Sequence, residues 1–143
     1  MNKLSPIDYF KRCITEKYVD FDSRARRAEY WYFRLFMFIS FLPFVFILIC
    51  GAALESEILI LSGIGLIALL SIGFILPSLS VTIRRLHDTN KSGWFYLIAF
   101  VPAGGIILFV FTVIEGDRRS NLYGPDPKAL LPPDLTDHLQ QRY

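Results

Sequence analysis

The 143-residue chain contains few of the residues that build catalytic or metal sites, with only two cysteines and two histidines. Cys13 lies in a polar segment and Cys50 in an apolar one, so we expect no disulfide between them. A zinc site needs three or four Cys, His or carboxylate ligands in one place, and the sequence offers no such group. We therefore expect no metal and no cofactor.

Charged residues and histidine are absent from three long runs, which cover residues 35–54, 58–83 and 92–114. Hydrophobic residues make up 53% of the chain, and its mean hydropathy is +0.42. Each run has at least the roughly 20 apolar residues that a helix needs to cross a bilayer. Three such runs leave too little polar chain to cover them in water, so we predict an all-α membrane protein.

The third run is interrupted near its middle by Pro102-Ala103-Gly104-Gly105. As one broken span it would give the chain three transmembrane helices and place the C-terminus outside. As a re-entrant hairpin it would dip into the bilayer and return, which the basic residues of the tail favour. Each half is only about 14 Å long and cannot cross alone. Because Pro and Gly are common inside transmembrane helices, we favour three spans.

Lysine and arginine are missing from the turn Glu55-Ser56-Glu57, whereas eight of them precede the first run. The short turn predicts a tight antiparallel hairpin of the first two spans. Because basic residues stay on the cytoplasmic side, we expect the N-terminus in the cytoplasm and the segment 84–91 on the same side. No cleavable signal is visible, since a long polar segment, residues 1–34, comes before the first run.

The polar N-terminal segment contains one expected helix. Ser5 and Pro6 are typical of a helix start, and Ile7, Phe10 and Ile14 then fall on one face. This pattern predicts an N-terminal amphipathic surface helix on the membrane. A helix packed on the protein's own cytoplasmic ends would bury the same stripe, so that alternative stays open.

A basic and aromatic cluster follows, and Asp22 or Ser23 is expected to cap the helix that contains it. Arginine binds lipid phosphates, and Trp and Tyr rings favour the depth of the headgroups. We expect no nucleic acid as a partner, because the first span begins directly after the cluster and the positive-inside rule explains its charge. The arginines are Arg24, Arg26, Arg27 and Arg34, and the expected interface anchors are Tyr30, Trp31 and, later, Trp94.

A charged elbow separates the second and third runs. Arg84 or Arg85 can pair with Asp88, since they are four and three residues apart on a helical end. Arginine also favours the negative end of a helix, so the elbow can be read as a paired C-terminal cap. In that interpretation Ser92 caps the next helix, and no ligand is needed.

A second interpretation joins the elbow to the arginines before the first span, on the same predicted side of the membrane. Guanidinium groups bind phosphate oxygens bidentately, so a collar of arginines fixed by carboxylates is suited to an anionic lipid headgroup. A membrane protein partner is the other expected ligand. The candidate residues are Arg24, Arg27, Glu29, Arg84, Arg85, His87 and Asp88.

Two other functions have weaker support in the sequence. His87-Asp88 beside arginines is compatible with phosphoryl chemistry on a lipid headgroup, but a single His-Asp pair is a weak catalytic signature. A transport subunit would need polar residues in the middle of the membrane. The predicted spans contain only scattered Ser, Thr and one Cys, and we therefore favour a non-enzymatic binding module.

Several short blocks, taken in order, resemble a known family, the small YhaH-like inner-membrane proteins grouped as domain of unknown function 805. The blocks run from Phe21 to Pro127. They are Phe21-Asp22-Ser23-Arg24-Ala25-Arg26-Arg27-Ala28-Glu29-Tyr30-Trp31, then Pro77, Arg84-Arg85-Leu86-His87-Asp88, Ser92-Gly93-Trp94, Gly116 and Asn121-Leu122-Tyr123-Gly124-Pro125-Asp126-Pro127. Ser23, Arg26 and Arg119 depart from the family's usual residues. The resemblance implies a multi-pass protein of the bacterial cytoplasmic (inner) membrane, and it implies no reaction.

The expected organisation is one membrane-embedded domain over residues 1–127. Residues 1–34 form its cytoplasmic amphipathic and basic segment, and residues 35–114 hold the membrane segments. Several prolines predict that residues 128–143 form a flexible tail. Just before it lies the tail motif, whose candidate residues are Asn121, Tyr123, Gly124 and Asp126.

Overall fold

The computed structural model describes residues 4–128 of the chain. Its helices are α1 (Pro6–Ile14), α2 (Arg27–Ala53), α3 (Glu57–Asp88), the 3-10 helix η1 (Gly93–Phe100) and α4 (Gly104–Val113). Within the described part, the sole β-type pairing is an isolated bridge between Asn121 and Gly124. The predicted all-α class is therefore confirmed for these residues. The predicted tail lies outside the described residues, apart from its first residue, Lys128.

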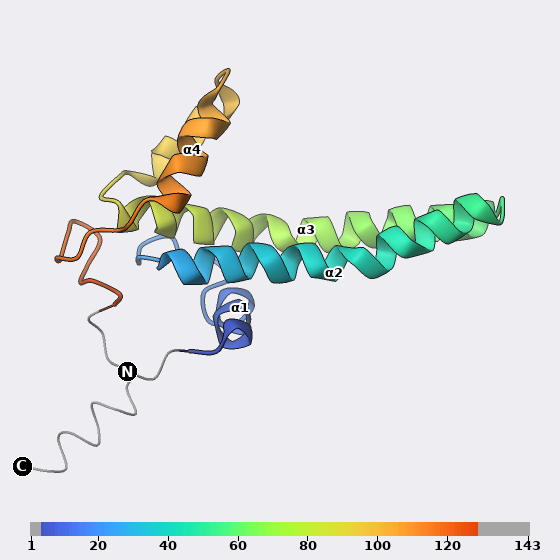
Figure 1. Ribbon diagram of the computed structural model, residues 1–143, viewed down its shortest axis with the longest axis horizontal. Coiled ribbons are helices and arrows are strands. Elements are labelled where there is room, and N and C mark those ends of the chain that lie inside the picture. The colour runs from blue at the N-terminus through green and yellow to red at the C-terminus, as the bar shows by residue number, and fades with distance from the viewer. Residues whose placement is uncertain (1–3, 129–143) are drawn as a thin grey trace, which may run out of the picture.

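The long helices α2 and α3 lie side by side as an antiparallel pair (Figure 1). Within residues 4–128, these two helices are long and apolar enough to cross a membrane. Their close approach depends on small residues, as is usual between membrane helices. A Cβ atom on Gly51 would lie 2.9 Å from the backbone nitrogen of Ile60, and one on Gly63 would meet the side chain of Leu48.

The expected third transmembrane helix is not confirmed. The run 92–114 folds back on itself, with η1 and α4 packed together as a short hairpin that leaves the α2–α3 pair at an oblique angle (Figure 1). Both ends of the hairpin lie at the Asp88 end of α3, since the backbone N–H of Asp117 donates to the carbonyl of Asp88 at 2.8 Å. The chain thus adopts the alternative in which the third run returns to its starting side.

The turn at the tip of the hairpin explains why the run does not continue as one helix. Ala103 has a φ of 63°, in the left-handed region that reverses the chain. Gly104 follows, and a Cβ there would collide with the backbone carbonyl of Ile98 in η1. The sequence Pro102-Ala103-Gly104 therefore makes a tight reversal, which a kinked transmembrane helix would not need.

Helix α1 begins as predicted, with a capping box in which Ser5 and Asp8 bond each other's backbone N–H groups. It lies across the α2–α3 pair and packs on both helices (Figure 1). Phe10 contacts the rings of Phe33, Phe36 and Phe74 at centroid distances of 5.4–6.3 Å. One side of α1 is therefore packed on the protein itself, as in the second interpretation of its sequence. Ile7, at the start of the predicted apolar face, remains 49% exposed.

The predicted cap of α2 was wrong. The helix begins at Arg27 and its N-cap residue is Arg26, which makes no side-chain capping bond. Asp22 and Ser23 instead belong to a loop organised by Asp20, whose carboxylate accepts from both of their backbone N–H groups at 3.1 Å. Burial alone would raise the pKa of Asp20, but hydrogen bonds from Ser23, Lys17 and Asp22 outweigh it and hold the pKa well below its usual range.

Candidate functional site

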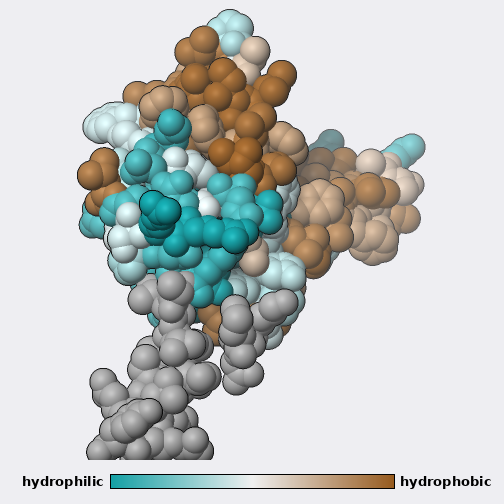
Figure 2. Space-filling model, turned by 60° about the vertical axis from the view of Figure 1, so that its left-hand side comes forward, coloured by the Kyte–Doolittle hydropathy of each residue, from teal (hydrophilic) through white to brown (hydrophobic). Residues whose placement is uncertain are grey.

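The predicted candidate residues lie together at the end of the molecule where α2 begins and α3 ends. Figure 2 looks toward this end, where hydrophilic residues gather below the apolar η1–α4 hairpin. Most of the candidates are nevertheless buried rather than open to solvent, and Arg84 and Arg85 are both 0% exposed. Arg27 is exposed. The buried candidates are Arg24, Glu29, Arg84, Arg85, His87 and Asp88.

The first half of this buried cluster is an ion pair between Arg84 of α3 and Glu29 of α2. The guanidinium also donates to Ser80 Oγ at 3.4 Å and to Cys13 Sγ at 3.6 Å, and the Cys13 thiol in turn donates to Glu29 at 3.7 Å. Burial, and then the Glu29 carboxylate, raise the pKa of Cys13 to about 11. The thiol is therefore protonated at neutral pH and links α1 to both long helices.

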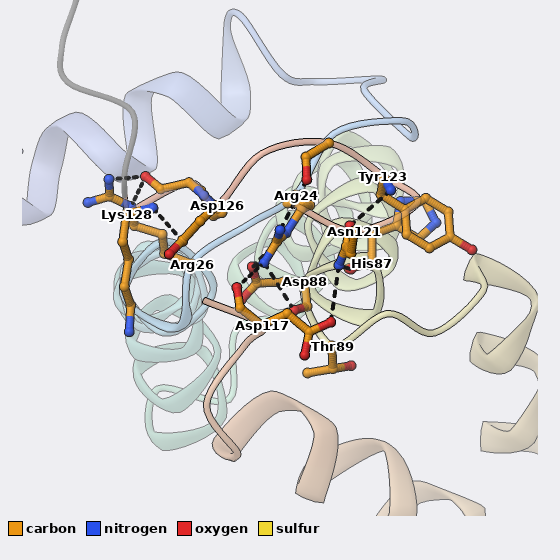
Figure 3. A network of polar contacts seen from close by, with 12 residues as sticks. Arg24, Arg26, His87, Asp88, Thr89, Asp117, Asn121, Tyr123, Asp126 and Lys128 are labelled. Atoms are coloured by element: carbon orange, nitrogen blue, oxygen red, sulfur yellow. Dashed lines mark hydrogen bonds and ion pairs between the residues drawn. The ribbon is translucent and has the colours of Figure 1, made fainter. Parts of the chain in front are cut away.

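The second half is centred on Asp88, which pairs with Arg85 and with Arg24 at 3.0 Å. Arg24 uses its remaining N–H groups on backbone carbonyls of the segment after α4 (Figure 3). Its guanidinium donates to Arg119 O at 2.8 Å, to Gly124 O at 3.1 Å and to Asp117 O. Arg85 donates likewise to the carbonyl of Ile114 at the base of α4. These two arginines therefore fasten the hairpin and the following loop to the α2–α3 pair.

The tail motif makes a third set of contacts with the end of α3. Asn121 Nδ2 donates to the carbonyl of His87 at 2.9 Å, and Asn121 Oδ1 accepts from the backbone N–H of Tyr123 at 2.9 Å. The ring of Tyr123 stacks on that of His87 with centroids 3.7 Å apart (Figure 3). Gly124 has a φ of 118°, and Asp126 Oδ1 accepts from the backbone N–H of Lys128 at 2.8 Å. The motif closes the loop over the buried cluster.

The predicted pairing inside the elbow is correct for one of its two arginines. Arg85 pairs with Asp88 three residues later, whereas Arg84 pairs with Glu29, 55 residues away. Sequence reasoning did not include Cys13 or the backbone carbonyls in the cluster. Gly116 was a usable signal, because a Cβ at this position would collide with the Asp88 carboxylate.

Further basic and aromatic side chains lie next to the cluster. We call Arg27, Arg34 and Lys91 the rim cations. Arg34 lies over the ring of Tyr30 at 5.3 Å, and Lys91 Nζ lies over that of Phe111 at 5.9 Å. Trp31 Nε1 donates to the carbonyl of Thr112 at 3.3 Å, so this predicted anchor joins α2 to α4.

The cluster has the chemistry of a structural clamp. Its arginines are turned toward carboxylates and carbonyls of the chain itself, which satisfies buried charge at close range. Among residues 4–128, no three His, Cys, Asp or Glu side chains are grouped so as to hold a metal ion. An open depression lies beside the cluster, lined by Asn90, Asp117 and residues 118–122, and Asn121 alone of the predicted residues lines it.

The helical fold, the two span-length apolar helices and the polar cluster at one end define a small helical protein of membrane type. Its relatives agree. The chain is 42% identical to "Inner membrane protein YhaI" of Escherichia coli (strain K12) over 116 residues, which cover 80% of this chain and 92% of the relative. It is 38% identical to "Inner membrane protein YhaH" of the same organism over 120 residues, covering 80% and 93%.

The family model described as "Protein of unknown function (DUF805)" matches residues 18–125. The chain therefore belongs to this family, as its short sequence blocks predicted. The matched range contains the charged residues of the buried cluster, though not Cys13, and ends within the tail motif. No solved structure matches this chain.

Proposed function

We propose that this protein is a multi-pass bacterial inner-membrane protein with two spans, α2 and α3, and a re-entrant η1–α4 hairpin. The cluster end, with the N-terminus, would face the cytoplasm, and the turn between the spans would face outward. Lysine and arginine gather at the first end, while Glu55 and Glu57 flank the turn, and this asymmetry supports the orientation. Helix α1, with Ile7 exposed, would lie at the cytoplasmic surface of the membrane.

In this arrangement the protein acts as a non-enzymatic module that binds anionic lipid at its cytoplasmic face. The observation that carries this proposal is a difference between two groups of cations. Arg24, Arg84 and Arg85 are occupied by the chain's own acceptors, so they hold the fold together. The rim cations lie outside those ion pairs and beside aromatic rings or α4: Arg34 lies over Tyr30, Lys91 over Phe111, and Arg27 bonds the carbonyl next to the one that Trp31 bonds. Cations beside aromatic rings at the end of apolar helices are suited to lipid phosphates.

Arg27 is the rim cation best placed for a phosphate. It is exposed, and its hydrogen bond to the carbonyl of Val113 at 2.8 Å uses one nitrogen of the guanidinium. An arginine has five N–H donors in a planar fork, so donors remain for a bidentate contact with a headgroup. Arg34 donates to Tyr30 and Thr82, both at 3.3 Å, which fixes its position near the first turns of α2.

The test compares two triple variants that remove the same charge from the same end of the molecule. The first replaces the rim cations (Arg27→Gln, Arg34→Gln, Lys91→Gln). The second replaces cations of the loop after α4 (Arg118→Gln, Arg119→Gln, Lys128→Gln). Native mass spectrometry of protein purified from membranes that contain phosphatidylglycerol counts the bound lipids. We expect the rim variant to lose bound phosphatidylglycerol and the loop variant to retain it.

Thermal unfolding of both variants checks that the clamp is intact. Equal loss of lipid in the two variants would mean a general charge effect and would contradict the proposal. So would unchanged lipid binding in the rim variant. If the unsubstituted protein carries a bound polypeptide in place of lipid, and the rim variant lacks it, the ligand is a membrane protein partner instead.

A further inference from the structure

The α3 helix is longer than a bilayer core, and its surplus length lies at the cluster end. Its 32 residues extend about 48 Å at 1.5 Å per residue, whereas the hydrocarbon is about 30 Å thick. Counting about 20 residues from Ile58, the first apolar residue, brings the hydrocarbon boundary to Pro77. Residues 78–88 then extend about 15 Å beyond it.

The neighbouring helix gives the same boundary. Arg34 precedes the apolar run of α2 and donates to Thr82 at 3.3 Å, and Ser78 donates to Met37 Sδ at 3.4 Å. The charged end of one apolar run therefore lies level with the polar end of the other. This agreement places the boundary near Arg34 and Ser78 in both helices.

Helix α1 lies at this boundary and reaches below it. Phe10 packs on Phe74, and the Tyr18 hydroxyl donates to the carbonyl of Gly73 at 2.7 Å. Gly73 and Phe74 lie three to four residues on the membrane side of Pro77, which is about 5 Å. An amphipathic helix buried to about 5–10 Å displaces lipid from one leaflet only.

The η1–α4 hairpin approaches the same leaflet from another side of the pair. Figure 1 shows α1 and the hairpin on opposite sides of α2–α3, and the two do not pack against each other in the described residues. The hairpin is apolar and widely exposed, with Trp94 at 80%, Phe100 at 79% and Ile106 at 68%. Phe109 packs edge-on against Trp31, three residues before Arg34, so α4 reaches the level of the headgroups beside the boundary. Lipid of the cytoplasmic leaflet is the occupant that this position provides.

The outer half of the pair has no such additions. From the boundary to the turn, α2 and α3 pack on each other, and side chains such as Ile58 at 81% and Leu61 at 68% remain exposed. Toward the turn the protein therefore consists of two helices, whereas at the cluster end α1 and the hairpin are added beside the pair, which in the proposed arrangement is the level of the cytoplasmic leaflet and its headgroups.

From this asymmetry we infer that the protein is a wedge that is wider on its cytoplasmic side. It should concentrate in membrane that is curved so that the cytoplasmic leaflet is the expanded, convex one. The inference rests on the two-span arrangement of the proposed function but not on its anionic lipid. The binding of interfacial helices that occupy one leaflet depends on membrane curvature. Here α1 and the hairpin both contribute apolar area, and they lie on two sides of the α2–α3 pair.

The experiment reconstitutes the full chain in giant vesicles of zwitterionic phosphatidylcholine, from which narrow membrane tethers are pulled. A fluorophore on Ser120→Cys, in a Cys50→Ala background, marks the cluster end, and an impermeant quencher separates molecules with that end outward from those with it inward. We expect outward molecules to be enriched in the tether and inward molecules to be depleted, more so as the tether narrows. Because the lipid carries no net charge, loss of anionic lipid binding leaves this result unchanged.

Three variants locate the effect. Trp94→Ser with Phe100→Ser makes the hairpin polar and should reduce the difference between the two orientations, whereas Trp94→Leu with Phe100→Leu keeps it apolar and should preserve it. Ile7→Ser tests α1 independently, should the hairpin variant fail to fold. Equal distribution of both orientations in the unsubstituted protein would overturn the inference. So would stepwise photobleaching that finds hairpin-dependent dimers without sorting, since the hairpin would then be covered by a second copy.

Discussion

The two halves of the α2–α3 pair are built on different principles. In the half toward the turn Glu55-Ser56-Glu57, which is the outer half in the proposed arrangement, apolar side chains such as Ile58 and Leu61 are exposed, and small residues such as Gly51 and Gly63 let the helices approach. In the cluster half, charged groups are buried in ion pairs that join α3 to Glu29 and Arg24, and hydrogen bonds add Cys13 of α1 and the loop after α4. The comparison teaches that the apolar half decides where the protein resides, while the polar half decides its particular shape.

Breaking the Arg84–Glu29 pair should have the largest effect. Glu29→Gln keeps the shape of the side chain but leaves a buried guanidinium without its carboxylate, which costs about 3–5 kcal/mol. Adding Arg84→Met removes the charge as well and should restore most of the unfolding free energy, measured in detergent by denaturant titration. A Glu29→Gln protein as stable as the unsubstituted one would show that the cluster half is not held by charge.

The hairpin tip should be almost as sensitive. Gly104→Ala places a methyl group on the backbone carbonyl of Ile98 and should cost about 3 kcal/mol, the upper end of overpacking, because backbone yields little. Gly105→Ala is the matched control, since a Cβ there meets nothing within 4 Å. Hydrogen exchange over residues 93–113 should increase in the first variant only. Similar exchange in both would contradict the tight reversal.

Cys13 makes the cluster half sensitive to alkali. Its pKa is raised to about 11 in the folded protein from an ordinary value of 9.0, so its contribution to stability is complete below pH 9 and is lost as pH rises through 11. The loss amounts to about 3 kcal/mol, from two pKa units at 1.36 kcal/mol each. In Cys13→Ala, unfolding free energies measured between pH 8 and 11 should fall less steeply. Parallel pH profiles of the two proteins would refute this link.

The outer half should tolerate change best. A Cβ on Gly65 meets nothing within 4 Å, and alanine favours a helix over glycine by about 0.8–1.0 kcal/mol, so Gly65→Ala should stabilise slightly or not at all. Gly63→Ala, two residues earlier, would instead press on Leu48 and should destabilise. The melting temperatures of the two variants in detergent provide the measurement. Marked destabilisation by Gly65→Ala would mean that the outer half packs more specifically than the structure indicates.

The same contrast explains how far the sequence predicted the fold. The α1 start at Ser5-Pro6 and the turn Glu55-Ser56-Glu57 depend on neighbouring residues, and both were predicted correctly. The direction of the third run depends on how Gly104 meets Ile98 and how Asp117 meets Asp88, which charge-free length does not report. A span and a hairpin have the same composition, so counting apolar residues favoured a third span that the structure does not confirm.

The sequence predicted which charged residues would meet in the candidate site, but it did not predict that they would be buried. Basic and acidic residues on the same predicted side indicated that Arg24, Glu29 and Asp88 would meet, and the structure brings them together. Their burial depends on α1 and on the loop after α4, whose contribution consists of backbone carbonyls that every residue possesses. A sequence pattern therefore identifies the arginines but not the backbone carbonyls to which they donate.

The reach of Arg24 has a consequence for how the protein is made. The carbonyls that it holds belong to residues 93 to 100 positions later in the chain, so they leave the ribosome long after the arginine does. Arg24 can therefore complete its contacts only after Gly124 has been made, and a chain interrupted before Gly124 leaves this buried guanidinium without one of its acceptors.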